Sequence, residues 1–118
     1  MAAARRADGP APPQGETMAF GCIGTMTARP GRRDEVIALL TGGSEGLKAA
    51  GCRLYVVGAD ADDDTTIWVS EVWESEEHHR ASLEPPETRA AIATAMPMLT
   101  GGFSGHRMAS VGGLGAED

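Results

Sequence analysis

Four stretches of the chain alternate between apolar and polar side chains, which is the period of a β-strand with two different faces. They cover residues 19–28, 53–58, 65–74 and 103–111. Little more than the acidic run DADDD separates the second stretch from the third. So short a connection requires these two strands to pair as an antiparallel hairpin.

Apolar residues at helical spacing follow the first strand. In residues 32–51, Val36, Leu40 and Leu47 recur on one face of a helix. The glycine-rich sequence TGGSEG interrupts this segment, and each glycine costs a helix roughly 1 kcal/mol relative to alanine. We therefore expect either a break in the helix at these glycines or a helix face that lets another backbone or a ligand come close.

Two short helices are predicted after the third strand. Ser75 is a suitable N-cap for the first, which Pro85 and Pro86 end. Residues 87–96 form the second. The resulting order, βαββααβ, predicts an α+β fold of the ferredoxin-like type, with an antiparallel sheet and helices on one face only.

The third strand carries large side chains on both of its faces. Ile67, Val69, Glu71 and Trp73 share one face, and Trp68, Ser70, Val72 and Glu74 share the other. Because the helices cover only one side of the sheet, the other side needs a second cover. The simplest cover is the sheet of a second subunit, which gives a dimeric α+β barrel.

The large aliphatic residues are few for a folded chain. Leu, Ile, Val and Phe together number 19, and the net charge is −7. All 19 lie between Phe20 and Leu114 at strand or helix period, which predicts one folded domain at 18–111 with flexible tails at 1–17 and 112–118. A core with so few large apolar side chains is stabilised further when it buries additional apolar surface against a partner subunit.

The charge and the cysteines exclude several classes of function. Seventeen acidic side chains outnumber ten basic ones, so nucleic acid and anionic membrane surfaces are not expected partners. No apolar run reaches the roughly 18 residues of a membrane span. Cys22 and Cys52 belong to no Cys-x-x-Cys pair, and two lone thiols fit a reducing cytoplasm.

Two pieces of sequence carry a family resemblance. The segment ARPGRRDEVIALL and the later EVWES, followed by the proline-interrupted helical pair, make residues 18–111 similar to the antibiotic biosynthesis monooxygenase family. The resemblance implies two ferredoxin-like subunits joined sheet to sheet, each with a pocket between sheet and helices. It also implies oxidation of polycyclic phenols by dioxygen without metal, flavin or haem. Many relatives carry a histidine on either side of the proline interruption, where this chain has Ser82 and Glu87.

Glu71 and Trp73 are the first candidates for chemistry. A carboxylate that shares a strand face with tryptophan and aliphatic residues is a candidate proton acceptor, and the indole is a candidate wall for a flat aromatic substrate. An ion pair between Glu71 and Arg53, and a space-filling role for Trp73, are the structural alternatives.

The histidines supply the other candidate bases. His79 shares a helix side with Leu83 and is expected to face inward, whereas His78 is expected on the solvated face. His106 on the last strand is either a base or a residue of the interface or solvent. Glu74 and His78 are spaced i, i+4, but two ligands without a third make a poor metal site.

From the sequence we expect a homodimeric, cofactor-independent monooxygenase that oxidises a quinol or anthrone with dioxygen as co-substrate. Glu71, His79 or His106 would take the proton. Trp73, Tyr55, Phe20 and Met96 would bind the substrate. The alternatives are a non-catalytic barrel that binds a small ligand or haem, a polyketide cyclase-like protein, and a pure dimerisation module.

Overall fold

The computed structural model describes residues 19–113. The predicted tail at 1–17, Met18 and the last five residues lie outside the described residues. Four strands form one antiparallel sheet in the order β2-β3-β1-β4. Their bounds are Ala19–Thr27 (β1), Cys52–Ala59 (β2), Thr66–Trp73 (β3) and Ser104–Ser110 (β4).

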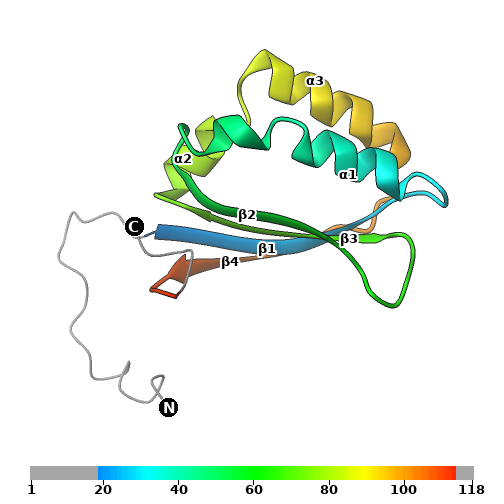
Figure 1. The fold of residues 1–118 in the computed structure, drawn as a ribbon, viewed down its shortest axis with the longest axis horizontal. Coiled ribbons are helices and arrows are strands. Elements are labelled where there is room, and N and C mark those ends of the chain that lie inside the picture. Colours follow the sequence, from blue (N-terminus) through cyan, green and yellow to red (C-terminus); the bar gives the residue numbers. More distant parts are fainter. Residues whose placement is uncertain (1–18, 114–118) are drawn as a thin grey trace, which may run out of the picture.

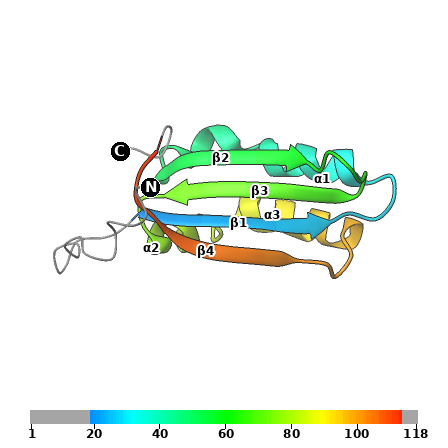
Figure 2. The same ribbon diagram turned by 90° about the horizontal axis from the view of Figure 1, so that it is seen from below.

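The helices all lie on one face of this sheet (Figure 1). They are α1 (Arg33–Thr41), α2 (Glu76–Ala81) and α3 (Pro86–Ala95), with the short 3-10 helices η2 (Ser44–Leu47) and η3 (Met96–Met98). Seen from the other side, the sheet has no helix in front of it (Figure 2). The predicted βαββααβ order and the ferredoxin-like α+β fold are confirmed.

The predicted break in the first helix is confirmed. Helix α1 ends at Thr41, and the chain passes through Gly42 and Gly43 into η2. Gly51 then turns the chain into β2 with φ +105°, a conformation that favours glycine. A Cβ atom at Gly51 would also lie 2.6 Å from Cδ2 of His78, so the glycine lets α2 approach the start of β2.

The first of the two later helices begins as predicted, whereas α3 begins one residue before the predicted start, at Pro86. The Oγ of Ser75 accepts a hydrogen bond from the backbone N–H of His78 (3.1 Å) and caps α2. Pro86 occupies the first turn of α3, where its missing N–H leaves no helical bond unmade. The prediction that the prolines end α2 is wrong, because α2 already ends at Ala81 and the prolines instead begin α3.

The register of the sheet assigns each side chain to a face. Tyr55, Glu71, Cys22 and Arg107 are directly opposite one another across the four strands. Because residues paired across a sheet point the same way, this row shares one face, which is the face beneath the helices. The adjacent row points to the opposite, open face and consists of Val56, Ser70, Ile23 and His106.

The core beneath the helices has two parts. One cluster lies under α1 and α3 and contains Ala28, Val36, Ile67, Val69, Ala95 and Leu99. The other lies under α2 and contains Phe20, Cys52 and Trp73. On β3, Ile67 and Val69 belong to the first cluster and Trp73 to the second, so Glu71 is placed between them.

The open face of the sheet carries exposed apolar side chains. Val56, Trp68 and Met108 are 51%, 42% and 49% exposed. The two tryptophans therefore lie on opposite faces, because Trp73 beneath the helices is only 1% exposed. Among residues 19–113, no helix has the length and apolar character to cross a membrane.

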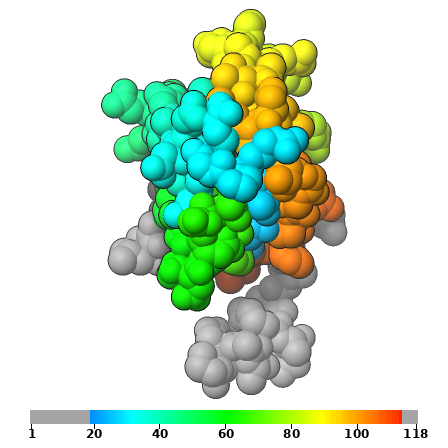
Figure 3. All heavy atoms as spheres, turned by 90° about the vertical axis from the view of Figure 1, so that its right-hand side faces the viewer, coloured from blue at the N-terminus to red at the C-terminus, as the bar shows by residue number. Residues whose placement is uncertain are grey.

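At one end of the sheet, the β2–β3 connection packs beside the start of α1 (Figure 3). The Arg33 guanidinium donates a 2.7 Å hydrogen bond to the backbone carbonyl of Asp63. This contact joins the hairpin to the helical layer at the end of the molecule that is remote from α2.

Candidate functional site

Glu71 is the acidic side chain of β3 that lies beneath the helices. Its side chain is only 16% exposed, and it stands between the two apolar clusters. A carboxylate in such a place needs polar partners, because an unpaired charge loses its hydration there. The arrangement of those partners defines the candidate site.

Two side chains approach the same oxygen of Glu71. The indole Nε1 of Trp73 donates a 2.9 Å hydrogen bond to Oε1. The Nε2 of His79 lies 3.7 Å from this oxygen, in ion-pair range when the imidazole is protonated. Arg53, the partner considered from the sequence, makes no ion pair with Glu71 in the described part of the chain. Trp73 therefore has a polar role beyond filling space.

Aromatic rings enclose the His79 imidazole. Its centroid lies 5.3 Å from that of Phe20, with the planes tilted by 35°, and 5.6 Å from that of Trp73, edge to face at 66°. These are ordinary distances for favourable ring contacts. The His79 side chain is still 23% exposed, so the imidazole connects the apolar cluster with solvent. The prediction that His79 faces inward is confirmed.

Helix α2 brings His79 to this position. The helix begins at Glu76, directly after its cap Ser75, which is 5% exposed and lies two residues beyond the end of β3. One turn later His79 points back toward the sheet. His78, one residue earlier, has a half-exposed side chain, contacts the Ser75 hydroxyl (2.6 Å) and lies 3.6 Å from Glu74.

Tyr55 lies beside Glu71 in the sheet but is held in its neutral form. Its hydroxyl donates a 3.1 Å hydrogen bond to the backbone carbonyl of Leu40. Burial, followed by the negative charge of Glu71, raises the pKa of Tyr55 to about 12. Tyr55 is therefore a wall and a neutral polar group of the site, and not its base.

The two cysteines are free thiols near the same carboxylate. Burial raises the pKa of both thiols, and the charge of Glu71 adds to the rise in each. The thiolate is the reactive form of cysteine, and these raised pKa values disfavour it at Cys22 and Cys52. Cys52 is buried, as predicted, while Cys22 is only partly covered.

The structure brings together five of the residues expected at the site: Phe20, Tyr55, Glu71, Trp73 and His79. It does not bring His106 to them. His106 pairs with Ile23 on the open face, whereas Glu71 and its neighbours face the helices. Within one subunit the sheet separates His106 from the carboxylate, since neighbouring positions of a strand point to opposite faces.

Met96 is also remote from Glu71. It lies where α3 passes into η3, with a half-exposed side chain. The chain continues to Leu99, which bridges to Ala28 just beyond the end of β1. Phe20, at the other end of β1, is eight positions away along the strand, or about 26 Å. The helix α3 therefore runs away from the site, which places Met96 at the opposite end of the sheet.

Two features escaped the sequence interpretation. The first is that Glu71 and His79 lie within 3.7 Å of each other, although they belong to a strand and a helix that are separated by a tight turn. The second is Arg107, whose Nη1 lies 2.6 Å from Oε2 of Glu76 on α2. Strand alternation could have indicated the position of Arg107. Neighbouring residues of a strand point to opposite faces, so Arg107 lies beneath the helices if His106 lies on the open face.

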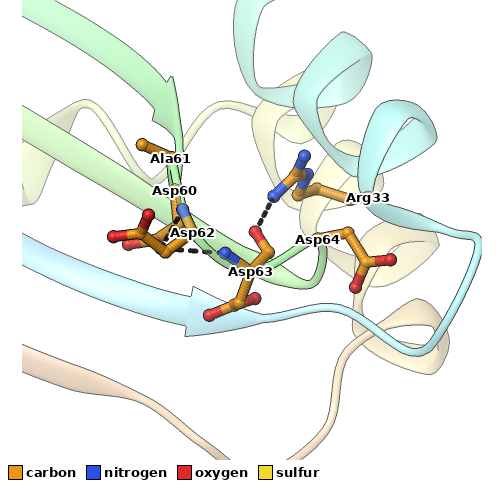
Figure 4. A pocket seen from close by; sticks show the side chains of 6 residues that line it. All are labelled: Arg33, Asp60, Ala61, Asp62, Asp63 and Asp64. Atoms are coloured by element: carbon orange, nitrogen blue, oxygen red, sulfur yellow. Dashed lines mark hydrogen bonds between the residues drawn. The ribbon is translucent and has the colours of Figure 1, made fainter.

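The acidic β2–β3 turn forms a depression with Arg33 (Figure 4). Two of its carboxylates, those of Asp60 and Asp63, accept hydrogen bonds from the turn and the start of β3. Asp60 accepts hydrogen bonds from the backbone N–H groups of Asp62 and Asp63 and from Trp68 Nε1. Asp63 accepts four, from the backbone and hydroxyl groups of Thr65 and Thr66. These bonds hold the pKa of both carboxyl groups below the usual range.

The described residues contain no group of three or more His, Cys, Asp or Glu side chains that could hold a metal ion. Glu71 and His79 supply two potential ligands, one fewer than the usual minimum of protein ligands at a catalytic zinc.

Comparisons with known proteins agree with this fold. A search of the curated proteins found no match. Among solved structures, a candidate antibiotic biosynthesis monooxygenase from Chloroflexus aurantiacus is 41% identical, with a TM-score of 0.76, and the match covers 84% of this chain and 99% of that one. A second candidate of that name, from Caulobacter crescentus, is 18% identical, with a TM-score of 0.73 and coverage of 82% and 93%.

A protein from Mycobacterium tuberculosis, 22% identical, has a TM-score of 0.69 and matches 81% of this chain and 98% of its own. These two more distant likenesses support the fold alone. The family model for antibiotic biosynthesis monooxygenases matches residues 19–94, which include both Glu71 and His79. With its ferredoxin-like sheet, this match and a 41% identical structural relative, the chain belongs to the antibiotic biosynthesis monooxygenase family.

Proposed function

We propose that the protein is a cofactor-independent monooxygenase that oxidises a hydroxylated aromatic, of the quinol or anthrone type, with dioxygen. The observation that carries the proposal is the Glu71 carboxylate, held by Trp73 and His79 between two apolar clusters. A carboxylate among aromatic side chains is suited to take a proton from a flat hydroxylated aromatic, because the rings can pack against the substrate.

Glu71 is assigned the role of general base. Its Oε1 is occupied by Trp73 and His79, while Oε2 accepts no hydrogen bond from the residues described. This second oxygen is therefore available to the acidic proton of a substrate. The Trp73 hydrogen bond fixes the carboxylate, and His79 can relay the proton to solvent because its ring is partly exposed.

Removal of the proton converts the substrate into an electron-rich anion that can pass an electron to dioxygen. For an anthrone, the ring CH2 group becomes a carbonyl. One atom of dioxygen enters the product, and the other leaves as water with the two hydrogens that the substrate has lost. Dioxygen is the oxidant in this reaction, and the protein contributes the base, the orientation of the substrate and the apolar surroundings.

We further propose a homodimer that pairs the open faces of two sheets. Val56, Trp68 and Met108 expose about half of their side chains on this face, and the central row around Ser70 carries no carboxylate. Apolar side chains gathered on one face are typical of a protein interface. Pairing would also add buried apolar surface to a thin core.

The test is dioxygen uptake by the purified protein with a panel of quinols and anthrones, with and without a chelator. We expect uptake that the chelator does not change, with one oxygen atom of labelled dioxygen in the product. Loss of uptake with the chelator would contradict cofactor independence. Tight binding of these compounds without uptake would replace the proposal by a ligand-binding role.

A further inference from the structure

Arg107 forms the ion pair that joins the edge strand β4 to helix α2. Its Nη1 lies 2.6 Å from Oε2 of Glu76, in the first turn of the helix. Arg107 belongs to the row of the sheet that contains Glu71, and Glu76 precedes His79 by three residues. The pair therefore connects the strand beside the site with the helix that carries the imidazole.

Apart from this ion pair, helix α2 meets the rest of the molecule through its entry, through the His78 ring beside Gly51 and through the His79 ring. It is six residues long, and none of these residues is buried. Its entry is held by the Ser75 cap and by the backbone bond from Glu74 to Gly51 (2.9 Å). Both attachments lie at the start of the helix, so they leave its tilt over the sheet to side-chain contacts.

The position of His79 depends on this tilt. The Nε2 of His79 lies 3.7 Å from Oε1 of Glu71, which is longer than an ordinary hydrogen bond. The His79 ring packs against the rings of Phe20 and Trp73. A small displacement of α2 would separate the imidazole from the carboxylate. Among residues 19–113, the other ion-pair partner of Glu76 is Arg80, at 3.9 Å on the same helix, and a contact within one helix cannot fix that helix against the sheet.

We propose that Arg107 is a positioning residue that sets α2, and through it His79, against Glu71. The proposal rests on the proposed function for its catalytic consequence, because His79 is the relay in that reaction. Arg107 does not touch Glu71 or His79, and it acts through Glu76. The Arg107 side chain is 71% exposed, so removing the pair leaves the fold intact, since exposed ion pairs contribute little to stability.

The structural test uses NMR of the full-length protein. In the wild type we expect nuclear Overhauser contacts from the His79 ring to the rings of Phe20 and Trp73. Arg107→Gln and Glu76→Gln should weaken both sets of contacts with an unchanged melting temperature. The charge-swapped double variant, Arg107→Glu with Glu76→Arg, and the conservative Arg107→Lys should restore them.

The kinetic test uses the same variants with a quinol or anthrone. We expect kcat to fall by roughly 10- to 100-fold in Arg107→Gln with little change in KM, because a displaced catalytic group loses its alignment. Arg32→Gln is the matched control. It removes another exposed Arg–Glu pair, Arg32–Glu35 on α1, and should change neither kcat nor the His79 contacts.

The proposal is overturned if Arg107→Gln keeps the Overhauser contacts of His79 at their wild-type strength. It is also overturned if these contacts are lost and neither the charge-swapped double variant nor Arg107→Lys restores them. The failure of the proposed function has a different signature. If the wild type oxidises no quinol or anthrone, that function is rejected, while the Overhauser contacts still decide whether Arg107 positions His79.

Discussion

The indole nitrogen of Trp73 donates a hydrogen bond to the carboxylate of Glu71, two residues earlier on the same strand face. The Trp73 side chain is only 1% exposed and belongs to the apolar cluster beneath α2. It thus connects this cluster to Glu71, the acidic residue on that face of β3. The bond fixes one carboxylate oxygen, while the other accepts no hydrogen bond from residues 19–113. This division of the two oxygens is the basis of the proposed catalytic role.

Glu71→Gln should abolish most of the proposed activity. The amide keeps the size of the side chain but cannot take a proton, and loss of a general base typically lowers kcat by about 10²- to 10⁴-fold. Dioxygen uptake under saturating substrate measures the effect. Glu77→Gln on α2 is the control, because Glu77 is exposed and makes no ion pair within residues 19–113. Equal activity in both variants would remove Glu71 from the mechanism.

Substitutions of Trp73 should separate its packing role from its polar role. Trp73→Ala removes a fully buried ring and should lower the free energy of unfolding by about 3–5 kcal/mol, measured by urea denaturation. Trp73→Phe should lose much less stability but still lower kcat, because phenylalanine cannot donate a hydrogen bond to Glu71. An unchanged kcat in Trp73→Phe would show that the hydrogen bond is dispensable.

A charge on the open face should dissociate the proposed dimer. Val56→Asp places a carboxylate on the exposed apolar face, on the edge strand β2, where pairing of two sheets would bury it. Light scattering should report the dimeric mass for the wild type and the monomeric mass for the variant. The control is Ile92→Asp on α3, a comparably exposed apolar residue on the helical side. A monomeric wild type would contradict the proposal.

Tyr55 offers a direct probe of the electrostatics at the site, because it is the one tyrosine of the chain. Its phenolate absorbance should appear with a midpoint near pH 12, above the usual 10. A raised pKa means that the associated stability is present below pH 10 and is lost as the pH rises toward 12. Glu71→Gln should lower the midpoint, whereas Glu77→Gln should not.

Asp63 should contribute to acid sensitivity through the β2–β3 turn. Four hydrogen bonds lower its pKa below the usual 3.8, so the stabilisation is present above that pH and is lost as the pH falls through the lower folded-state pKa. Asp63→Asn should lower the urea midpoint at neutral pH, and its difference from wild type should shrink in acid.

Asp64→Asn is the control for this prediction, because the Asp64 side chain accepts no hydrogen bond from the residues described. It should have nearly the wild-type urea midpoint at both pH values. A constant difference between Asp63→Asn and wild type across the acid range would contradict the assignment.

The sequence by itself determined the order of the elements and the faces of the strands. Strand alternation placed Trp73 and Trp68 on opposite faces, Ser75 marked the start of α2, and the glycines after Thr41 marked the end of α1. These features depend on local periodicity, capping and backbone freedom, which neighbouring residues encode. The family resemblance followed from the same order and spacing.

Only the tertiary structure decided which candidates meet. Glu71, His79 and Phe20 come from β3, α2 and β1, and their distances depend on the register of the sheet and the tilt of a short helix. The same register places His106 on the open face, and the direction of α3 carries Met96 to the far end of the sheet. Packing between elements sets these relationships, and no local sequence pattern specifies it.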